Sequence, residues 1–188
     1  LVLHKFKRLS HCLYALARVE DNVAHQNLMI QEITKRYHEA NHTPALKERT
    51  MPLTFQDLHQ LIRSAAMRAD ELHIPVVISI VDANGTESVT WRMPDALLVS
   101  SELAPKKAWT AVAMKTATHK LADTVQPGAP LYGLESHMQG KVVTFGGGFP
   151  LWRDGKLLGG LGISGGSVEQ DMDIAQSAMA AINVGVNQ

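Results

Sequence analysis

The sequence predicts an α/β (α+β) fold in which helices pack on a five-stranded antiparallel sheet. Two hairpin signals, Asn84-Gly85 and Asp154-Gly155, each join two strand-like runs. Helix-like segments with capping residues precede, separate and follow these hairpins. Hairpin connections imply antiparallel strands, so the expected order from residue 54 is helix, two strands, helices, three strands and helix.

The spacing of apolar residues in the N-terminal part of the sequence predicts a helical extension. Residues 9–40 carry apolar side chains at helical spacing with no Gly or Pro. The stretch "NHTPALKERTMP" that follows contains two prolines and few apolar residues. We therefore expect a helical segment over 1–42, a linker over 43–52 and a domain over 53–188. Because the sequence begins without Met, we expect a segment of a longer protein.

The first helix of the domain is predicted to begin at Thr54. Thr54 and Asp57 have capping-box spacing, and the helix must end by His73–Ile74 because Pro75 follows. Its apolar residues recur on one side, which predicts the face that packs on the core: Leu58, Leu61, Ile62, Ala65, Ala69 and Leu72.

The remaining elements follow from shorter patterns. The β-branched run Val76–Val81 predicts a buried strand, and Asn84-Gly85 after it predicts a type I′ turn. Residues 95–122 are helix-prone, with a break expected at Pro105, and residues 141–147, "KVVTFGG", predict a strand. A final helix is expected to be capped by Ser167 and Gln170 and to turn these residues inward: Val168, Met172, Ala175, Met179, Ile182 and Val186.

The stretch "LGGLGISGG", residues 158–166, has the G-x-G-x-x-G spacing of dinucleotide-binding turns. A dinucleotide site needs a parallel β-α-β unit, whereas the strand before these glycines is the second arm of a hairpin. We expect instead that Gly159, Gly160 and Gly162 let another element approach an inner strand closely. "FGGGFP", residues 145–150, is interpreted as a kinked strand junction that lines a groove.

Composition excludes several classes of function. The 18 basic and 18 acidic residues cancel, so charge alone does not predict binding to nucleic acid or to a membrane surface. The single cysteine, Cys12, excludes an intrachain disulfide framework and a cysteine-rich metal site, and favours a cytoplasmic setting. No apolar run is long enough to predict a membrane span, and the N-terminus does not have the pattern of a signal peptide.

Several motifs resemble those of a known family. "PVVISIVDANG", "APKKAWTAVAMKTAT", "GGGFPLWRDGKLLGGLGISGG" and the closing helix resemble the GlcG/HbpS family of haem- or corrinoid-associated domains. They are most similar to the C-terminal domain of PduO-type cobalamin adenosyltransferases, over residues 52–188. The resemblance implies a profilin-like, three-layer α/β/α arrangement with a five-stranded antiparallel sheet, and a homo-oligomer held through haem or through sheet and helix faces.

"RLSHCLYALARVED" resembles the last helix of the adenosyltransferase domain of that family. Lys7 and His11 depart from the usual Asn-Arg-Leu-Ser-Asp pattern, and the family's ATP loop is absent from this sequence. We therefore expect no adenosyltransferase activity from this chain, but expect it from the adenosyltransferase domain of a longer parent protein. The resemblance also implies propanediol utilisation inside a bacterial microcompartment.

The leading candidate for an iron ligand is His59. Haem iron takes His, Met, Cys or Tyr as axial ligands, and imidazole is largely neutral near pH 7. Helix geometry places His59 on the exposed flank of the first domain helix, with Arg63 one turn further for a propionate. Met67 points away from the core. We hypothesise a six-coordinate haem shared between subunits, with a second chain supplying the other axial His; the alternative is an ordinary solvated histidine.

The other histidines rank below His59. His119 is the second candidate for a haem-facing ligand, and His137 the third. His73 is interpreted as a helix-end residue. His38 and His42 have the spacing of zinc-binding helices, but no third ligand is evident.

Three lysines complete the candidates for chemistry. Lys106 and Lys107 follow Pro105 in an expected first helical turn, and Lys115 lies further along; a solvated charged face is the default interpretation. The resemblance implies that these lysines line a groove for an anionic ligand. We also expect Lys106, Gly147 and Phe149 to line the cofactor site.

The leading hypothesis is a non-catalytic b-type haem-binding domain that supports cobalamin chemistry. Two alternatives stay open: a cobalamin adenosyltransferase or corrinoid reductase, with a corrinoid as ligand, and a purely structural assembly domain. Asp82 and Glu87 flank the first hairpin and are interpreted as turn residues. No Ser–His–Asp set can be assigned by spacing.

Overall fold

The computed structural model describes residues 31–32, 35 and 52–185. The chain divides into two compact units, residues 1–49 and 50–188. Residues 31, 32 and 35 are helical, as predicted. The rest of the expected N-terminal helix, the linker up to residue 51, Cys12, His38 and His42 lie outside the described residues.

The sheet has four antiparallel strands in the order β2-β1-β4-β3. Every pairing is antiparallel, so the predicted hairpins are confirmed. The inner strands β1 and β4 are almost entirely buried, as the apolar runs in both predict. The strands are β1 (Val77–Asp82), β2 (Glu87–Arg92), β3 (Gly148–Arg153) and β4 (Lys156–Ser164).

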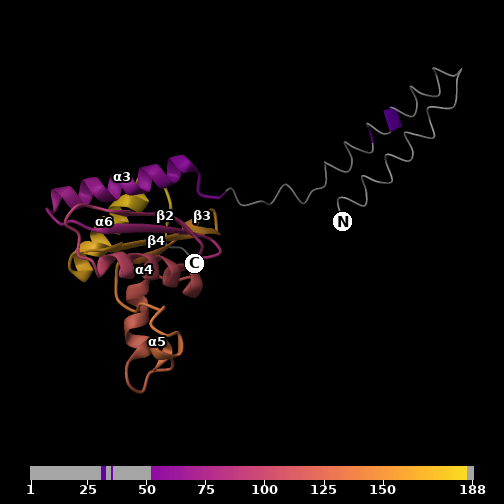
Figure 1. Cartoon of the computed structure of the whole chain (residues 1–188). Coiled ribbons are helices and arrows are strands. Elements are labelled where there is room, and N and C mark those ends of the chain that lie inside the picture. The colour runs from indigo at the N-terminus through magenta and orange to yellow at the C-terminus, as the bar shows by residue number, and fades with distance from the viewer. Residues whose placement is uncertain (1–30, 33–34, 36–51, 186–188) are drawn as a thin grey trace, which may run out of the picture. The chain divides into compact units, whose positions relative to one another are not determined.

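Helices cover both faces of this sheet. Figure 1 shows α3 and α6 on one face and α4 on the other, with the segment that carries α5 extending beyond α4. The three layers and the mixed α+β class agree with the sequence prediction. The helices are α3 (Phe55–Glu71), α4 (Ser100–Met114), the 3-10 helix η2 (Thr118–Val125), α5 (Leu134–His137) and α6 (Val168–Ala180).

The prediction of a fifth strand over residues 141–147 is wrong. Val142, Val143 and Thr144 are buried, but they belong to no strand. The Val143 N–H donates to Oγ1 of Thr110 on α4 at 3.0 Å instead of to a neighbouring strand. Gly147, with φ +108°, leaves the extended conformation. The apolar run therefore packs as irregular chain, which an apolar pattern alone does not distinguish from a buried strand.

The predicted break at Pro105 is also wrong. Pro105 lies inside α4, which runs on to Met114. A proline near the start of a helix removes one backbone hydrogen bond, and the following turns proceed. Lys106 and Lys107 therefore lie beyond the first turn, and successive residues of a helix point about 100° apart.

The two hairpin turns differ. At Asn84-Gly85 only Gly85 has positive φ (+78°), so this is not the predicted type I′ turn. The Asp82 carboxylate accepts hydrogen bonds from the backbone N–H groups of Asn84 and Thr86 (2.8 and 2.9 Å) and fixes another turn conformation. At Asp154-Gly155 both residues have positive φ (+52° and +72°), which is the combination that a type I′ turn requires.

The helix caps and the core-facing residues largely follow the prediction. Thr54 with Asp57, and Ser167 with Gln170, form complete capping boxes. Val168 is the exception, because it is exposed in the first turn of α6, where its side chain covers Gly146. The core-facing side of α3 is buried at Leu61, Ala65 and Ala69 and half-buried at its other members. Of the residues predicted to turn inward at the final helix, Ala175 and Met179 of α6 and Ile182 just after it are buried, Met172 is half-buried, and Val186 lies outside the described residues.

The glycines of β4 let α4 approach the sheet closely. A Cβ at Gly160 would lie 2.4 Å from the Ala108 carbonyl oxygen, and one at Gly162 would lie 2.0 Å from that of Ala104. Both distances are below any real contact, so the helix backbone rests directly on the strand. This confirms the expected close approach, and it accounts for the glycine motif without a nucleotide.

Candidate functional site

Four side chains form a row along the outer side of α3. We call Phe55, His59, Arg63 and Met67 the α3 stripe; each is four residues from the next, so they lie above one another on one helix face. All four are exposed, Phe55 at 83% and Met67 at 54%. The predicted exposure of His59, Arg63 and Met67 is thus what the structure shows.

The imidazole of His59 lies beside the Phe55 ring. The two rings stack with centroids 6.4 Å apart and planes 19° apart. Among the described residues, His59 has no hydrogen-bond partner and Arg63 has no ion-pair partner. Arg68, one turn further on, is instead paired with Glu71 and Asp173 at 2.9 and 2.7 Å. The stripe therefore offers an imidazole and a guanidinium that the described part of the chain does not use internally.

Phe55 was not singled out from the sequence. Its position four residues before His59 could have identified it, because that spacing places a large aromatic ring on the same outer face of the helix. Met67, at the other end of the stripe, borders a shallow pocket of about 390 Å³ between α3 and α6. An apolar side chain thus flanks the central imidazole and guanidinium at each end.

His119 lies in a different place. It is the second residue of η2 and half-buried, and its ring centroid is 5.8 Å from that of Phe149 on β3. Both residues line a pocket of about 380 Å³ that includes no residue of the α3 stripe. Burial, and then the charge of Lys120, lower the pKa of the His119 imidazole. The structure brings two predicted residues together here, but not with His59.

The other histidine candidates stand alone. His137 is the exposed last residue of α5, and His73 is exposed just after α3 with φ +56°. In the described part of the chain, no group of three or more His, Cys, Asp or Glu side chains is arranged to hold a metal ion. A metal centre built from protein ligands alone is therefore not what the described residues provide.

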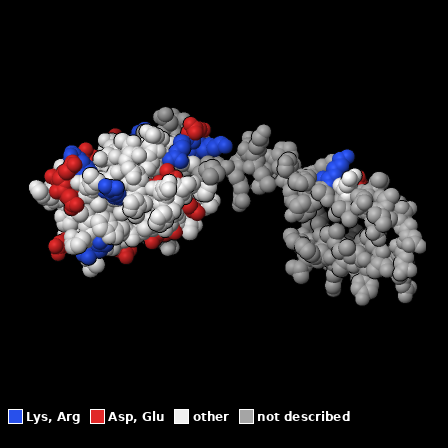
Figure 2. All heavy atoms as spheres, turned by 90° about the horizontal axis from the view of Figure 1, so that it is seen from above, with Lys and Arg blue, Asp and Glu red and all other residues white. Residues whose placement is uncertain are grey.

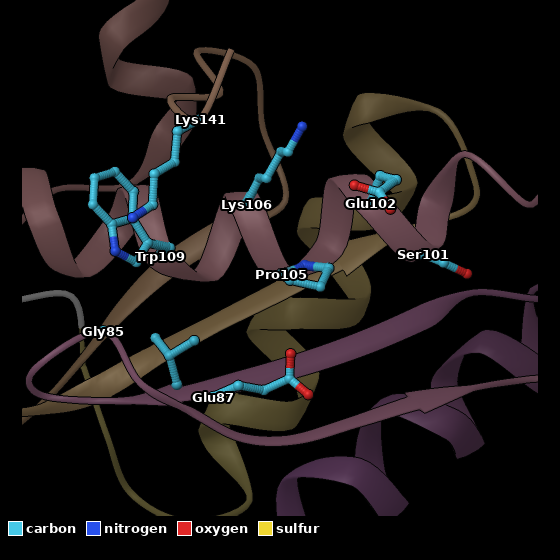
Figure 3. Close-up of a pocket in the computed structure, with 9 residues that line it drawn as sticks. Gly85, Glu87, Ser101, Glu102, Pro105, Lys106, Trp109 and Lys141 are labelled. Carbon is cyan, nitrogen blue, oxygen red and sulfur yellow. The ribbon is translucent and has the colours of Figure 1, made fainter. Parts of the chain in front are cut away.

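Lys106 lines a pocket of about 490 Å³ between α4 and the first hairpin. Figure 3 shows Glu87 extending from β2 toward Pro105, while Lys106 points away from the strands. Glu102 shares the lining, and Lys141 lies 3.9 Å from the centre of the Trp109 ring. Glu87 is thus a pocket residue in addition to its expected place beside the turn. The lining thus holds two carboxylates and two lysines, so its charges do not select the anionic ligand that the resemblance implied.

Lys107 contradicts the expectation of a solvated lysine. It is 1% exposed, and its Nζ donates to Oδ2 of Asp171 at 2.7 Å and to the Ile163 carbonyl oxygen at 2.8 Å. The Phe145 ring centre lies 5.1 Å from the same nitrogen. Gly147 is buried in this cluster, where an added Cβ would lie 2.8 Å from Nζ. Gly147 therefore makes room for Lys107 and does not line an open groove.

The Lys107–Asp171 pair links α4 to the start of α6. Burial lowers the pKa of Lys107 and raises that of Asp171, and the attraction between the two charges opposes both shifts. Asp171 also accepts a hydrogen bond from the Gly166 N–H at 2.9 Å. With its donors directed to protein acceptors and to an aromatic ring, Lys107 serves packing and not ligand binding. Lys115 is exposed at the end of α4 with φ +51°.

The surface above α3 is mostly uncharged. Figure 2 shows this side of the domain, where uncharged residues predominate, acidic residues gather toward one end and a few basic residues lie among the others. None of the helices in the described residues is long and apolar enough to cross a membrane.

The family model of the haem-degrading, HbpS-like proteins matches residues 53–180. The chain belongs to the HbpS-like family. The resemblance inferred from the motifs is thereby confirmed. Two solved structures share the fold over most of the domain: that of a PduOC:heme complex (80% identity, TM-score 0.73, covering 73% of this chain and 100% of that chain) and that of Klebsiella pneumoniae protein ORFY (35% identity, TM-score 0.68, covering 72% and 94%).

Curated relatives extend beyond this chain. The corrinoid adenosyltransferases PduO of Citrobacter freundii and Salmonella typhimurium are 73% and 72% identical to it over 187 and 188 residues. The chain spans about half the length of these relatives, 56% in each case. An uncharacterized 15.0 kDa protein of Citrobacter freundii is 40% identical over 127 residues, covering 68% of this chain and 89% of that protein.

Proposed function

We propose that this chain binds haem on the α3 stripe, with His59 as an axial ligand of the iron. The observation that carries the proposal is the exposed imidazole of His59, which has no hydrogen-bond partner among the described residues and lies in a row with an aromatic ring, a guanidinium and a thioether. Membership of the HbpS-like family and the similarity to the PduOC:heme complex support it.

The residues of the stripe fit the chemistry of haem. The macrocycle is apolar and planar, so Phe55 and Met67 offer contact area on either side of the iron ligand. Arg63 lies one turn from His59, within reach of a propionate, and forms charge-assisted hydrogen bonds best with carboxylates. When bound, haem supplies an iron centre for redox chemistry, and an axial imidazole tunes its potential.

A single α3 stripe covers only one face of a haem. Iron takes two axial ligands, and the opposite face would leave apolar surface in water. A second copy of the chain supplies both a second His59 and a second Phe55. We therefore propose a haem shared by two subunits; His119 remains the alternative iron ligand, and a corrinoid the alternative macrocycle.

Spectral titration of the apoprotein with hemin tests this assignment. The wild type is expected to give the absorption spectrum of a bis-imidazole complex, and His59→Ala to lose it. His137→Ala removes another exposed histidine and should leave both spectrum and affinity unchanged. Loss of the complex in His119→Ala but not in His59→Ala would move the iron to the other pocket.

We also propose that the chain is an accessory domain of a longer corrinoid adenosyltransferase. The chain is similar to the two PduO proteins along its whole length, which supports a role as one of their domains. The part of each PduO protein that the chain does not cover leaves room for another domain. A role in propanediol utilisation, in a cytoplasmic microcompartment, belongs to the same proposal. An assay with ATP and cob(I)alamin should show no turnover by the chain itself; turnover would favour the enzymatic alternative.

A further inference from the structure

The pocket beside His119 is distinct from the α3 stripe. It has a volume of about 380 Å³ and lies between η2, β3 and the C-terminal end of α6. Phe149, Met179 and Val184 make most of its lining apolar, and His119, Lys120 and Gln176 are its polar side chains. A mostly apolar cavity with a few polar groups is the usual form of a small-molecule site.

His119 presents a polar atom that the described residues leave unsatisfied. Its Nδ1 is buried and has no hydrogen-bond partner among them. A buried polar atom without a partner costs about 1–3 kcal/mol, so native structures normally fill such positions with water or ligand. Burial lowers the pKa of the ring and so favours its neutral form, which has one N–H donor and one acceptor nitrogen.

We propose that this pocket binds a small aromatic monocarboxylate. The ring of the ligand would lie against Phe149 and Met179, and its carboxylate would face His119 and Lys120. We infer a negatively charged ligand because the lining contains one ammonium group and no carboxylate among the described residues. The apolar remainder disfavours a ligand that is charged at several positions, such as a polyphosphate. The proposal does not depend on haem, because no residue of the pocket belongs to the α3 stripe.

Benzoate is the probe, and the full chain is the sample. We expect a saturable change in the imidazole NMR signals of His119 near pH 7, with a dissociation constant below about 1 mM. The bound carboxylate should also raise the pH at which His119 titrates, because an adjacent anion favours the imidazolium. Signals of His73 and His137 should not move. Absence of a saturable change at His119 would overturn the proposal.

Matched variants and ligands separate the parts of the proposal. Lys120→Gln should weaken benzoate binding at least about fivefold, which is about 1 kcal/mol, whereas Lys115→Gln should leave it unchanged. Benzamide, which lacks the charge, should bind more weakly; equal affinity would overturn the carboxylate assignment. His119→Gln should abolish the benzoate-dependent heat in calorimetry. Displacement of benzoate by stoichiometric hemin would contradict a site separate from the haem site.

Discussion

Removing the ammonium of Lys107 should destabilise the domain strongly. In Lys107→Met, the carboxylate of Asp171 stays buried without its partner at 2.7 Å, and the Ile163 carbonyl loses a donor at 2.8 Å. Breaking one side of a buried ion pair costs about 3–5 kcal/mol. For a domain of about 130 residues this corresponds to a fall in Tm on the order of 10–18 °C. Lys106→Met, which breaks no ion pair within the described part of the chain, should change stability by no more than about 0.5 kcal/mol.

The Asp171→Asn variant completes a double-mutant cycle. The introduced amide keeps an acceptor for the Gly166 N–H and carries no charge, so the double variant should recover at least about 2 kcal/mol relative to the sum of the single variants. Chemical denaturation followed by circular dichroism measures all four stabilities. A loss below about 1 kcal/mol in Lys107→Met, or simple additivity in the cycle, would refute the argument that this pair links α4 to α6.

Three further predictions concern positions away from this pair. The folded-state pKa of His119 is lowered, so the unfolded chain binds protons first and stability falls as the pH drops through about 6.5; an NMR titration midpoint of His119 at or above 6.5 would contradict this. Gly162→Ala should cost at least about 3 kcal/mol because its Cβ would meet Ala104, whereas Gly128→Ala, with open space around it, should cost only about 1 kcal/mol through its positive φ; equal losses in thermal unfolding would exclude the packing explanation. Thr54→Ala should cost about 1 kcal/mol by removing the cap of α3, and an unchanged Tm would show that the cap is dispensable.

Local patterns in the sequence determine much of this fold. The core-facing side of α3 and its cap at Thr54 depend on residues within one or two turns, so spacing alone reveals them. The exposure of His59 follows from the same helix geometry. The prediction of a type I′ turn at Asn84-Gly85 was wrong because the side chain of Asp82, two residues before Asn84, determines the conformation of the turn.

Long-range contacts explain what local patterns missed. Lys107 and Asp171 are 64 residues apart, and nothing near either position shows that they meet in the interior. The triple glycine that leads into β3 was the nearest signal, because Gly147 leaves the space that Lys107 fills. Val143 likewise has the pattern of a strand residue, but its N–H donates to Thr110 on α4. Such partners depend on the tertiary arrangement and have no local sequence signature.

The stoichiometry of hemin binding tests the proposed haem site most directly. If two copies of His59 hold one iron, titration followed by optical absorption should end at about one haem per two chains, with a low-spin bis-imidazole spectrum. Mass determination of the loaded protein should then show pairs of chains. An end point of one haem per chain with a five-coordinate spectrum, or a protein that stays colourless with excess hemin, would contradict the account.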